Sequence, residues 1–133
     1  MMQIPVSHLD LLKDETRAFA YLATLMKDGS AQVTPVWFNH DDSHLLINSA
    51  QGRLKDRNMR ARPEVTLCIA DPANPYRYLQ IRGKVVAFTT DGAEAHINAL
   101  NQKYHGTPDY KKSRPDEVRV TYTIEPVKID AHG

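Results

Sequence analysis

Residues 45–63 read LLINSAQGRLKDRNMRARP, and the organisation of the chain can be worked out from this stretch. It begins as an apolar strand and passes through small and polar residues to Gly52, where the predicted bend calls for a residue that tolerates unusual backbone angles. Five basic side chains follow within ten positions: Arg53, Lys55, Arg57, Arg60 and Arg62. Pro63 ends the helix that they predict. The stretch therefore predicts a strand, a turn and a cationic helix start.

The turn and the helix start have the chemistry of an anion site. Backbone N–H groups at the start of a helix have no intrahelical partner, and they can bind a phosphate. The hydroxyl of Ser49 and the charges of Arg53 and Lys55 flank the same bend. The alternative interpretation is a solvent-exposed basic helix, since most runs of charge are exposed faces. These residues by themselves leave both interpretations open.

Composition limits the class of protein. A chain of 133 residues with 41% hydrophobic and 25% charged residues predicts one globular domain over residues 1–133. No apolar run approaches membrane-spanning length and the N-terminus does not resemble a secretory signal, so we expect a cytoplasmic protein. The single cysteine, Cys68, lies in an apolar run and is expected to fill the core. A net charge of +1 gives no reason to expect nucleic acid or a membrane as a partner.

Six strands are predicted, and two residues mark special places in them. The strands are expected at residues 18–25, 31–39, 45–49, 64–70, 76–89 and 118–124. Pro35 cannot donate a ladder hydrogen bond, which predicts an edge strand, a bulge or a backbone that faces a ligand. Gly83 predicts a bulge or bend in the longest strand. The first predicted strand carries Phe19 and Tyr21 on one side, and we expect it to be buried.

Two helices and the last strand complete the expected elements. Ser7 is expected to cap a short N-terminal helix, and Asp91 a longer one over residues 91–106. The apolar stripe of the longer helix is Ala93, Ile97, Leu100 and Tyr104. A polar loop follows at residues 107–117. The last strand is expected to turn Val118, Val120, Tyr122 and Ile124 inward and Arg119 outward, and to end at Pro126.

These elements predict a mainly β fold with peripheral helices, a small closed or nearly closed antiparallel barrel. His40 and His44 flank two aspartates, but their four-residue spacing suits a helix, whereas the local residues predict a turn. We therefore expect no metal site.

Three segments together resemble a known family. They are DGSAQVTPVWF at residues 28–38, LLINSAQGRLKDRNMRARPEVTL at residues 45–67 and DPANPYRYLQIRGKV at residues 71–85. In order and spacing they resemble the split-barrel flavoproteins related to pyridoxamine 5'-phosphate oxidase, and most closely the branch that uses the deazaflavin coenzyme F420. The resemblance extends over about residues 11–129. It implies a six-stranded antiparallel split β-barrel (the FMN-binding split barrel) and a homodimer with two cofactor sites at the subunit interface.

The resemblance also implies cofactor-binding residues. The phosphate would be held by Ser49, Arg53 and Lys55, with Arg57 close behind. The flat ring would lie beside Val33, Thr34, Pro35, Val36 and Trp37, and the opposite subunit would close the pocket with Tyr76 and Tyr78. Ordinary structural roles are the alternative: Trp37 as an interface core residue, the two tyrosines as strand aromatics and Arg57 as a surface charge.

The implied activity is hydride transfer from reduced coenzyme F420 to an unsaturated small organic acceptor. The cofactor carries the hydride, so no catalytic side chain is expected. The alternatives are an FMN-dependent oxidoreductase of the same class and a non-catalytic protein that binds a flavin or haem. Oxidation of pyridoxamine phosphate itself is not expected, because the C-terminal substrate-binding residues of those oxidases have no match in this chain.

Overall fold

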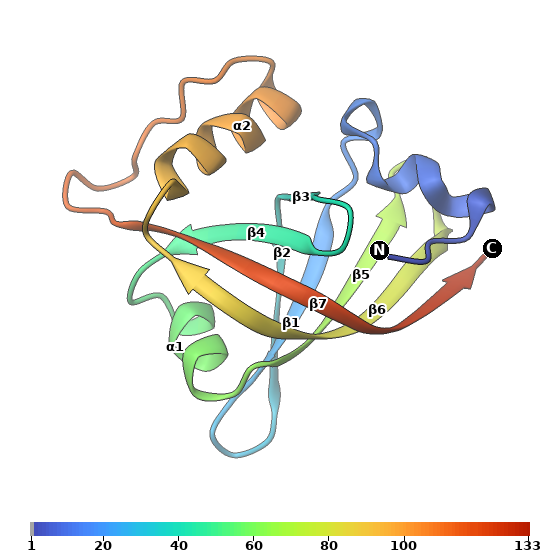
Figure 1. The fold of residues 1–133 in the computed structure, drawn as a ribbon, viewed down its shortest axis with the longest axis horizontal. Coiled ribbons are helices and arrows are strands. Elements are labelled where there is room, and N and C mark those ends of the chain that lie inside the picture. The colour runs from blue at the N-terminus through green and yellow to red at the C-terminus, as the bar shows by residue number, and fades with distance from the viewer. Residues whose placement is uncertain (1) are drawn as a thin grey trace.

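A curled antiparallel sheet surrounds the core in the computed structural model, which describes residues 2–133. Its seven strands lie in the order β2-β1-β5-β6-β7-β4-β3 (Figure 1). They are β1 (Ala20–Leu25), β2 (Ala31–Val36), β3 (Phe38–His40), β4 (Leu45–Ala50), β5 (Glu64–Asp71), β6 (Asn74–Thr89) and β7 (Arg119–His132). The helices are the 3₁₀ segments η1 (Val6–Leu12) and η2 (Asp14–Thr16) and the α-helices α1 (Leu54–Ala61) and α2 (Ala93–His105).

The predicted count of six strands is wrong, because the expected strand at residues 31–39 bends at Trp37 and forms two. Its first part, β2, pairs with β1, and its second part, β3, pairs with β4. These two parts are the opposite edges of the sheet, and only Trp37 lies between them. The sheet therefore curls until its edges nearly meet, which makes a half-barrel. Pro35 lies in the edge strand β2, as its missing N–H predicted.

Gly83 lies at a bulge where β6 passes β7. The register shifts between Arg82 and Gly83, and a Cβ at Gly83 would lie 2.8 Å from the carbonyl oxygen of Glu125. The predicted bulge is confirmed. Pro126 pairs with Gly83 at this irregularity, and β7 continues beyond it to His132. The prediction that Pro126 ends the strand is wrong, because the bulge accepts a residue without an N–H donor.

The core fills the inside of the curled sheet. Its largest fully buried side chains come from six of the strands, from η1 and from α1: Leu11, Leu22, Phe38, Leu45, Ile47, Met59, Leu67, Ile69, Leu79, Ile81 and Tyr122. Burial of each such side chain stabilises the fold by about 1.5–3 kcal/mol relative to exposure. This core holds β4, β7 and the start of α1 in fixed relative positions.

The outer face of β1 is also apolar. Ala20, Leu22 and Thr24 face the core, whereas Phe19 and Tyr21 are exposed. The predicted strand is confirmed, but the side that we expected to be buried is the outer one. Cys68 pairs in register with Tyr21 and is half-buried, so its expected place in the core is wrong. Inward and outward faces are set by the curl of the sheet, which the alternating pattern does not show.

The helices differ from prediction mainly at their starts. Helix α2 begins after Gly92, whose φ is 74°, and no side chain caps it, so the expected Asp91 cap is absent. The predicted stripe of α2 is buried, as expected. Ser7 bonds to the ring of its neighbour His8 at 2.8 Å instead of capping η1.

None of the helices among residues 2–133 has the length and apolarity that a membrane crossing requires.

Candidate functional site

The turn between β4 and α1 is held rigidly from the core. Gly52 has a φ of 91°, which favours glycine, and its N–H donates to Asp56 at 2.9 Å. The buried carboxylate of Asp56 also accepts hydrogen bonds from Tyr122 on β7 and, at 2.9 Å, from Arg60. Helix α1 follows with Arg53 at its N-cap, and no side chain within residues 2–133 caps it. The sequence prediction of a strand, a bend and a cationic helix start is confirmed.

A hollow of about 350 Å³ lies beside this turn. It brings together six of the predicted cofactor-binding residues: Pro35, Val36, Trp37, Ser49, Arg53 and Lys55. The other side chains that line it are Phe19, Asn48, Ile97, Tyr110 and Arg119. We call the apolar and aromatic part of this lining the apolar wall (Phe19, Pro35, Val36, Trp37 and Ile97), and the polar and cationic part the polar or cationic wall (Asn48, Ser49, Arg53, Lys55, Tyr110 and Arg119).

Two predicted residues carry buried hydroxyl groups without partners. Ser49 is 1% exposed, and its Oγ finds no hydrogen-bond partner among residues 2–133. The Oγ1 of Thr34 on β2 is in the same situation. Burial of a hydroxyl without a partner costs about 1–3 kcal/mol. Since Ser49 lines the hollow, a ligand with an acceptor oxygen there can satisfy its hydroxyl.

The cations of the polar wall are not fully neutralised. Burial, and then the charges of Arg53 and Arg119, lower the pKa of the Lys55 ammonium. Lys55 forms no ion pair with any of residues 2–133. In that part of the chain, Glu117 is the only carboxylate that pairs with Arg53 or Arg119. Three cations thus share one anion, which leaves the hollow with an excess of positive charge.

Arg119 is the main residue of this wall that sequence analysis missed. It lies on the outward face of β7, as predicted, but α2 and residues 107–117 cover that face and bury it. Its Nε donates to Asn48 at 2.8 Å, and its Nη1 donates to Tyr110 at 3.1 Å and to Glu117 at 3.2 Å. Val118, which we expected inside, is exposed. No local pattern in the sequence signals this arrangement.

His96 supports the polar wall from α2. Its Nε2 donates to Asn39 at 2.8 Å, and its Nδ1 lies 3.0 Å from the amide of Asn48. Burial, together with the charge of Arg119, lowers the pKa of His96 to about 4. His96 is therefore neutral at physiological pH and orients Asn48, which in turn holds Arg119.

Two aromatic side chains of the apolar wall, Phe19 and Trp37, stack on Tyr104, which lies outside the lining of the hollow. The rings of Trp37 and Tyr104 are nearly parallel, with centroids 5.1 Å apart, and Phe19 stacks on Tyr104 at 5.3 Å. The edge of His105 lies against Trp37. Tyr104 also donates to the carbonyl of Ala18 at 2.6 Å, which fixes the stack. A flat apolar ring can pack against such a wall.

The remaining predicted residues lie outside the hollow within one chain. Val33 and Arg57 are exposed and do not line it. Tyr76 is 83% exposed, and Tyr78 stacks on His132 at 4.9 Å, at the far end of β6 from α2. The role of Tyr76 and Tyr78 in the opposite subunit stays a prediction.

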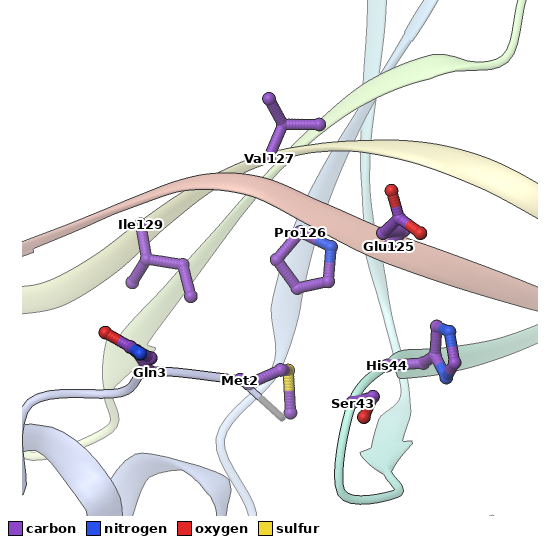
Figure 2. A pocket seen from close by; sticks show the side chains of 8 residues that line it. All are labelled: Met2, Gln3, Ser43, His44, Glu125, Pro126, Val127 and Ile129. Atoms are coloured by element: carbon purple, nitrogen blue, oxygen red, sulfur yellow. The ribbon is translucent and has the colours of Figure 1, made fainter.

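A second, larger hollow of about 510 Å³ lies between the N-terminal segment, the β3–β4 turn and the bend of β7 at Pro126 (Figure 2). Its lining residues are Met2, Gln3, Ser43, His44, Glu125, Pro126, Val127 and Ile129. None of the predicted cofactor-binding residues is among them, and it has neither an unpartnered buried hydroxyl nor a lysine or arginine. The hollow beside Ser49 is therefore the better candidate, since its lining combines cationic side chains and a buried hydroxyl with aromatic side chains.

The chain matches the family model described as pyridoxamine 5'-phosphate oxidase over residues 9–133. No curated protein matches it. Among solved structures, an F420 reductase is 34% identical, with a TM-score of 0.82 over 96% of this chain and 98% of that one. A putative pyridoxamine 5'-phosphate oxidase from Listeria innocua is 19% identical, with a TM-score of 0.70 and 94% of each chain covered. A conserved hypothetical protein from Mycobacterium tuberculosis is 16% identical, with a TM-score of 0.74 over 98% and 86%. The last two share the fold.

Proposed function

Because the chain belongs to the pyridoxamine 5'-phosphate oxidase family, we propose that it is an oxidoreductase whose cofactor binds in the hollow beside Ser49. The cofactor that we propose is coenzyme F420, and the reaction is hydride transfer from its reduced form to an unsaturated small organic acceptor. The 34% identity to an F420 reductase, over almost the full length of both chains, favours the deazaflavin. The observation that carries the proposal is the unpartnered hydroxyl of Ser49 beside uncompensated cations.

The residues present fit a phosphate group. The hydroxyl of Ser49 can donate to a phosphate oxygen, and Arg53 and Lys55 can contribute charge-assisted hydrogen bonds of about 1.5–3 kcal/mol each. The helix start at Leu54 has no side-chain cap, so its N–H groups are also available. Asp56 holds the turn in place before the ligand arrives, which lowers the entropic cost of binding.

The apolar wall fits the ring. Val36 and Trp37 offer apolar contact, and β2 is an edge strand, with backbone groups on its outer side that pair with no other strand. Pro35 has no N–H, so only the carbonyl is available at that position. Backbone groups at an edge can hydrogen-bond to the polar rim of a ring while the aromatic stack supports its face.

The bound deazaflavin supplies the hydride, and the protein's own residues bind it, orient it and exclude water. Ser49, Arg53 and Lys55 anchor the phosphate end, which fixes how far the ring extends along Trp37. We assign no side chain as a general acid, because His96 makes its hydrogen bonds to Asn39 and Asn48 and stays neutral. The rate enhancement then comes from orientation at the ring.

We further propose a homodimer, with Tyr76 and Tyr78 of one subunit closing the site of the other. Support comes from exposed apolar side chains on the outer surface: Phe19, Tyr21, Val33, Tyr76 and Val127. Exposed apolar surface of this kind favours association. Multi-angle light scattering on the purified protein tests this proposal, since a monomer at micromolar concentration would contradict it.

The competing cofactor is FMN, which the family match favours. Parallel fluorescence titrations with F420 and FMN test the choice. We expect tighter binding of F420 and a colourless protein after purification. A yellow protein that retains FMN through purification would support the FMN-dependent alternative. Oxidation of reduced F420 in the presence of enones or quinones then tests for an enzyme, since binding without turnover of any acceptor would indicate a carrier.

A further inference from the structure

The carboxylate of Glu117 is surrounded by hydrogen-bond donors and by two arginines of the cationic wall. Its side chain is 3% exposed and accepts hydrogen bonds from Ser113 at 2.7 Å and from Tyr110 at 3.0 Å. It also pairs with Arg119 at 3.2 Å and with Arg53 at 3.4 Å. These four donors come from residues 107–117, β7 and the N-cap of α1, so Glu117 joins the loop to the phosphate-binding turn.

The two arginines are held unequally. The side chain of Arg119 is 4% exposed and is also bound to Asn48 and Tyr110. The side chain of Arg53 is 46% exposed, and among residues 2–133 it donates a hydrogen bond only to Glu117, at 3.4 Å. Arg53 also lines two hollows, the candidate site and an adjoining hollow of about 410 Å³ beside Ser113 and Arg114. Of the two arginines, Arg53 can therefore leave Glu117 for another anion at the lower cost in free energy.

Glu117 is charged in the folded protein. Burial acts to raise the pKa of its carboxyl, but the hydrogen bonds from Ser113 and Tyr110 and the charge of Arg119 outweigh burial and lower the pKa. If Arg53 leaves, Glu117 keeps its bonds to Ser113, Tyr110 and Arg119. The exchange thus leaves no buried charge without a partner, which would otherwise be strongly destabilising.

We propose that Glu117 is an internal counter-ion of the phosphate site, and that an incoming phosphate must take Arg53 over from it. This inference rests on the proposed function, since it places the phosphate of the cofactor at Arg53. Glu117 neutralises part of the charge of the cationic wall in the free protein and so lowers its affinity for anions in general. Only a ligand with additional contacts, such as a ring against Trp37, then binds tightly. Glu117 therefore influences which anions the site binds, through its ion pair with Arg53.

The test compares Glu117→Gln with Asp116→Asn. Both remove one negative charge at adjacent positions, but Asp116 is exposed and forms no ion pair among residues 2–133. Inorganic pyrophosphate, FMN and F420 are each titrated by calorimetry at low and at high ionic strength. We expect Glu117→Gln to bind each anion that the wild type binds about 3- to 10-fold more tightly, as removal of one repulsive charge within about 7 Å implies. The gain should shrink at high salt, and Asp116→Asn should change affinity less than about twofold.

A merely structural role for Glu117 predicts the opposite sign, because loss of its charge would loosen residues 107–117 and weaken binding. Weaker or unchanged binding in Glu117→Gln, relative to Asp116→Asn, would overturn the inference. Thermal melting checks that the variant folds. If it does not, Glu117→Asp serves in its place: the shorter side chain keeps its charge but withdraws from Arg53, so a smaller tightening is expected, and weaker or unchanged binding would overturn the inference.

The outcomes separate this inference from the proposed function. If pyrophosphate binds and Glu117→Gln tightens it, but neither F420 nor FMN binds, the proposed function fails and the counter-ion role stands. If a cofactor binds and Glu117→Gln does not tighten it, the counter-ion role fails alone. If none of the three anions binds to either protein, both fail.

Discussion

The hydroxyl of Tyr122, near the start of β7, donates a hydrogen bond to the carboxylate of Asp56 on α1, 66 residues away in sequence. Both side chains are buried. Because Asp56 also accepts the N–H of Gly52, this bond connects the core of the barrel to the turn that we propose binds phosphate.

Replacement of Tyr122 by Phe should weaken both the fold and the site. Loss of a hydrogen bond to a buried carboxylate should lower the free energy of unfolding by about 1.5–3 kcal/mol, as measured in urea. We also expect weaker cofactor binding, because the turn at Gly52 loses one of its supports. Tyr21→Phe is the control, since Tyr21 is exposed and its hydroxyl makes no hydrogen bond within residues 2–133. Equal effects of the two changes would contradict the role given to the Tyr122–Asp56 bond.

Replacement of Ser49 by Ala should have opposite effects on stability and binding. The free protein loses a buried hydroxyl that has no partner, so its free energy of unfolding should stay the same or rise by up to about 1 kcal/mol. Cofactor affinity should fall by about 1–2 kcal/mol, because the phosphate loses a donor. Ser30→Ala is a matched change at an exposed serine that bonds to Asp28. A clear loss of stability in Ser49→Ala would show that its hydroxyl already has a partner.

Removal of both cations in the double variant Arg53→Ala, Lys55→Ala should weaken cofactor binding by about 3 kcal/mol or more, which is about 100-fold in Kd. The fold should survive, since neither side chain belongs to the core. The double variant Lys13→Ala, Lys27→Ala removes the same charge from exposed positions outside the hollow. Fluorescence titration compares the two. Affinity that falls no further than in the control would remove the phosphate assignment.

Acid should destabilise the protein through His96. Its pKa is about 4 in the folded state and about 6.5 in the unfolded state, so the unfolded state binds more protons between these values. The stability that His96 contributes is complete above pH 6.5 and is lost as the pH falls toward 4. Between pH 7 and pH 5 we expect a loss of about 1–2 kcal/mol, with allowance for partial exposure.

Urea unfolding at both pH values measures this loss, and His96→Gln should abolish most of it. His105→Gln is the control, because His105 is exposed at the end of α2. A pH dependence that persists in His96→Gln would assign the effect to other groups.

The features that sequence alone determined are local ones. The bend at Gly52 before a basic helix and the bulge at Gly83 each depend on the backbone preferences of a few adjacent residues. Six of the predicted cofactor-binding residues come from two short segments, residues 35–37 and 49–55, and the curl of the sheet brings these two segments to one hollow.

Only the tertiary structure decided which distant segments meet and which faces are covered. Arg119 becomes part of the site because Asn48, 71 residues away, and residues 107–117 enclose it, although its place in an alternating pattern predicts exposure. Trp37 divides one predicted strand into two because the sheet curls until its edges meet there. Contacts of this kind depend on how the whole sheet closes around its core, and no short stretch of residues specifies that closure.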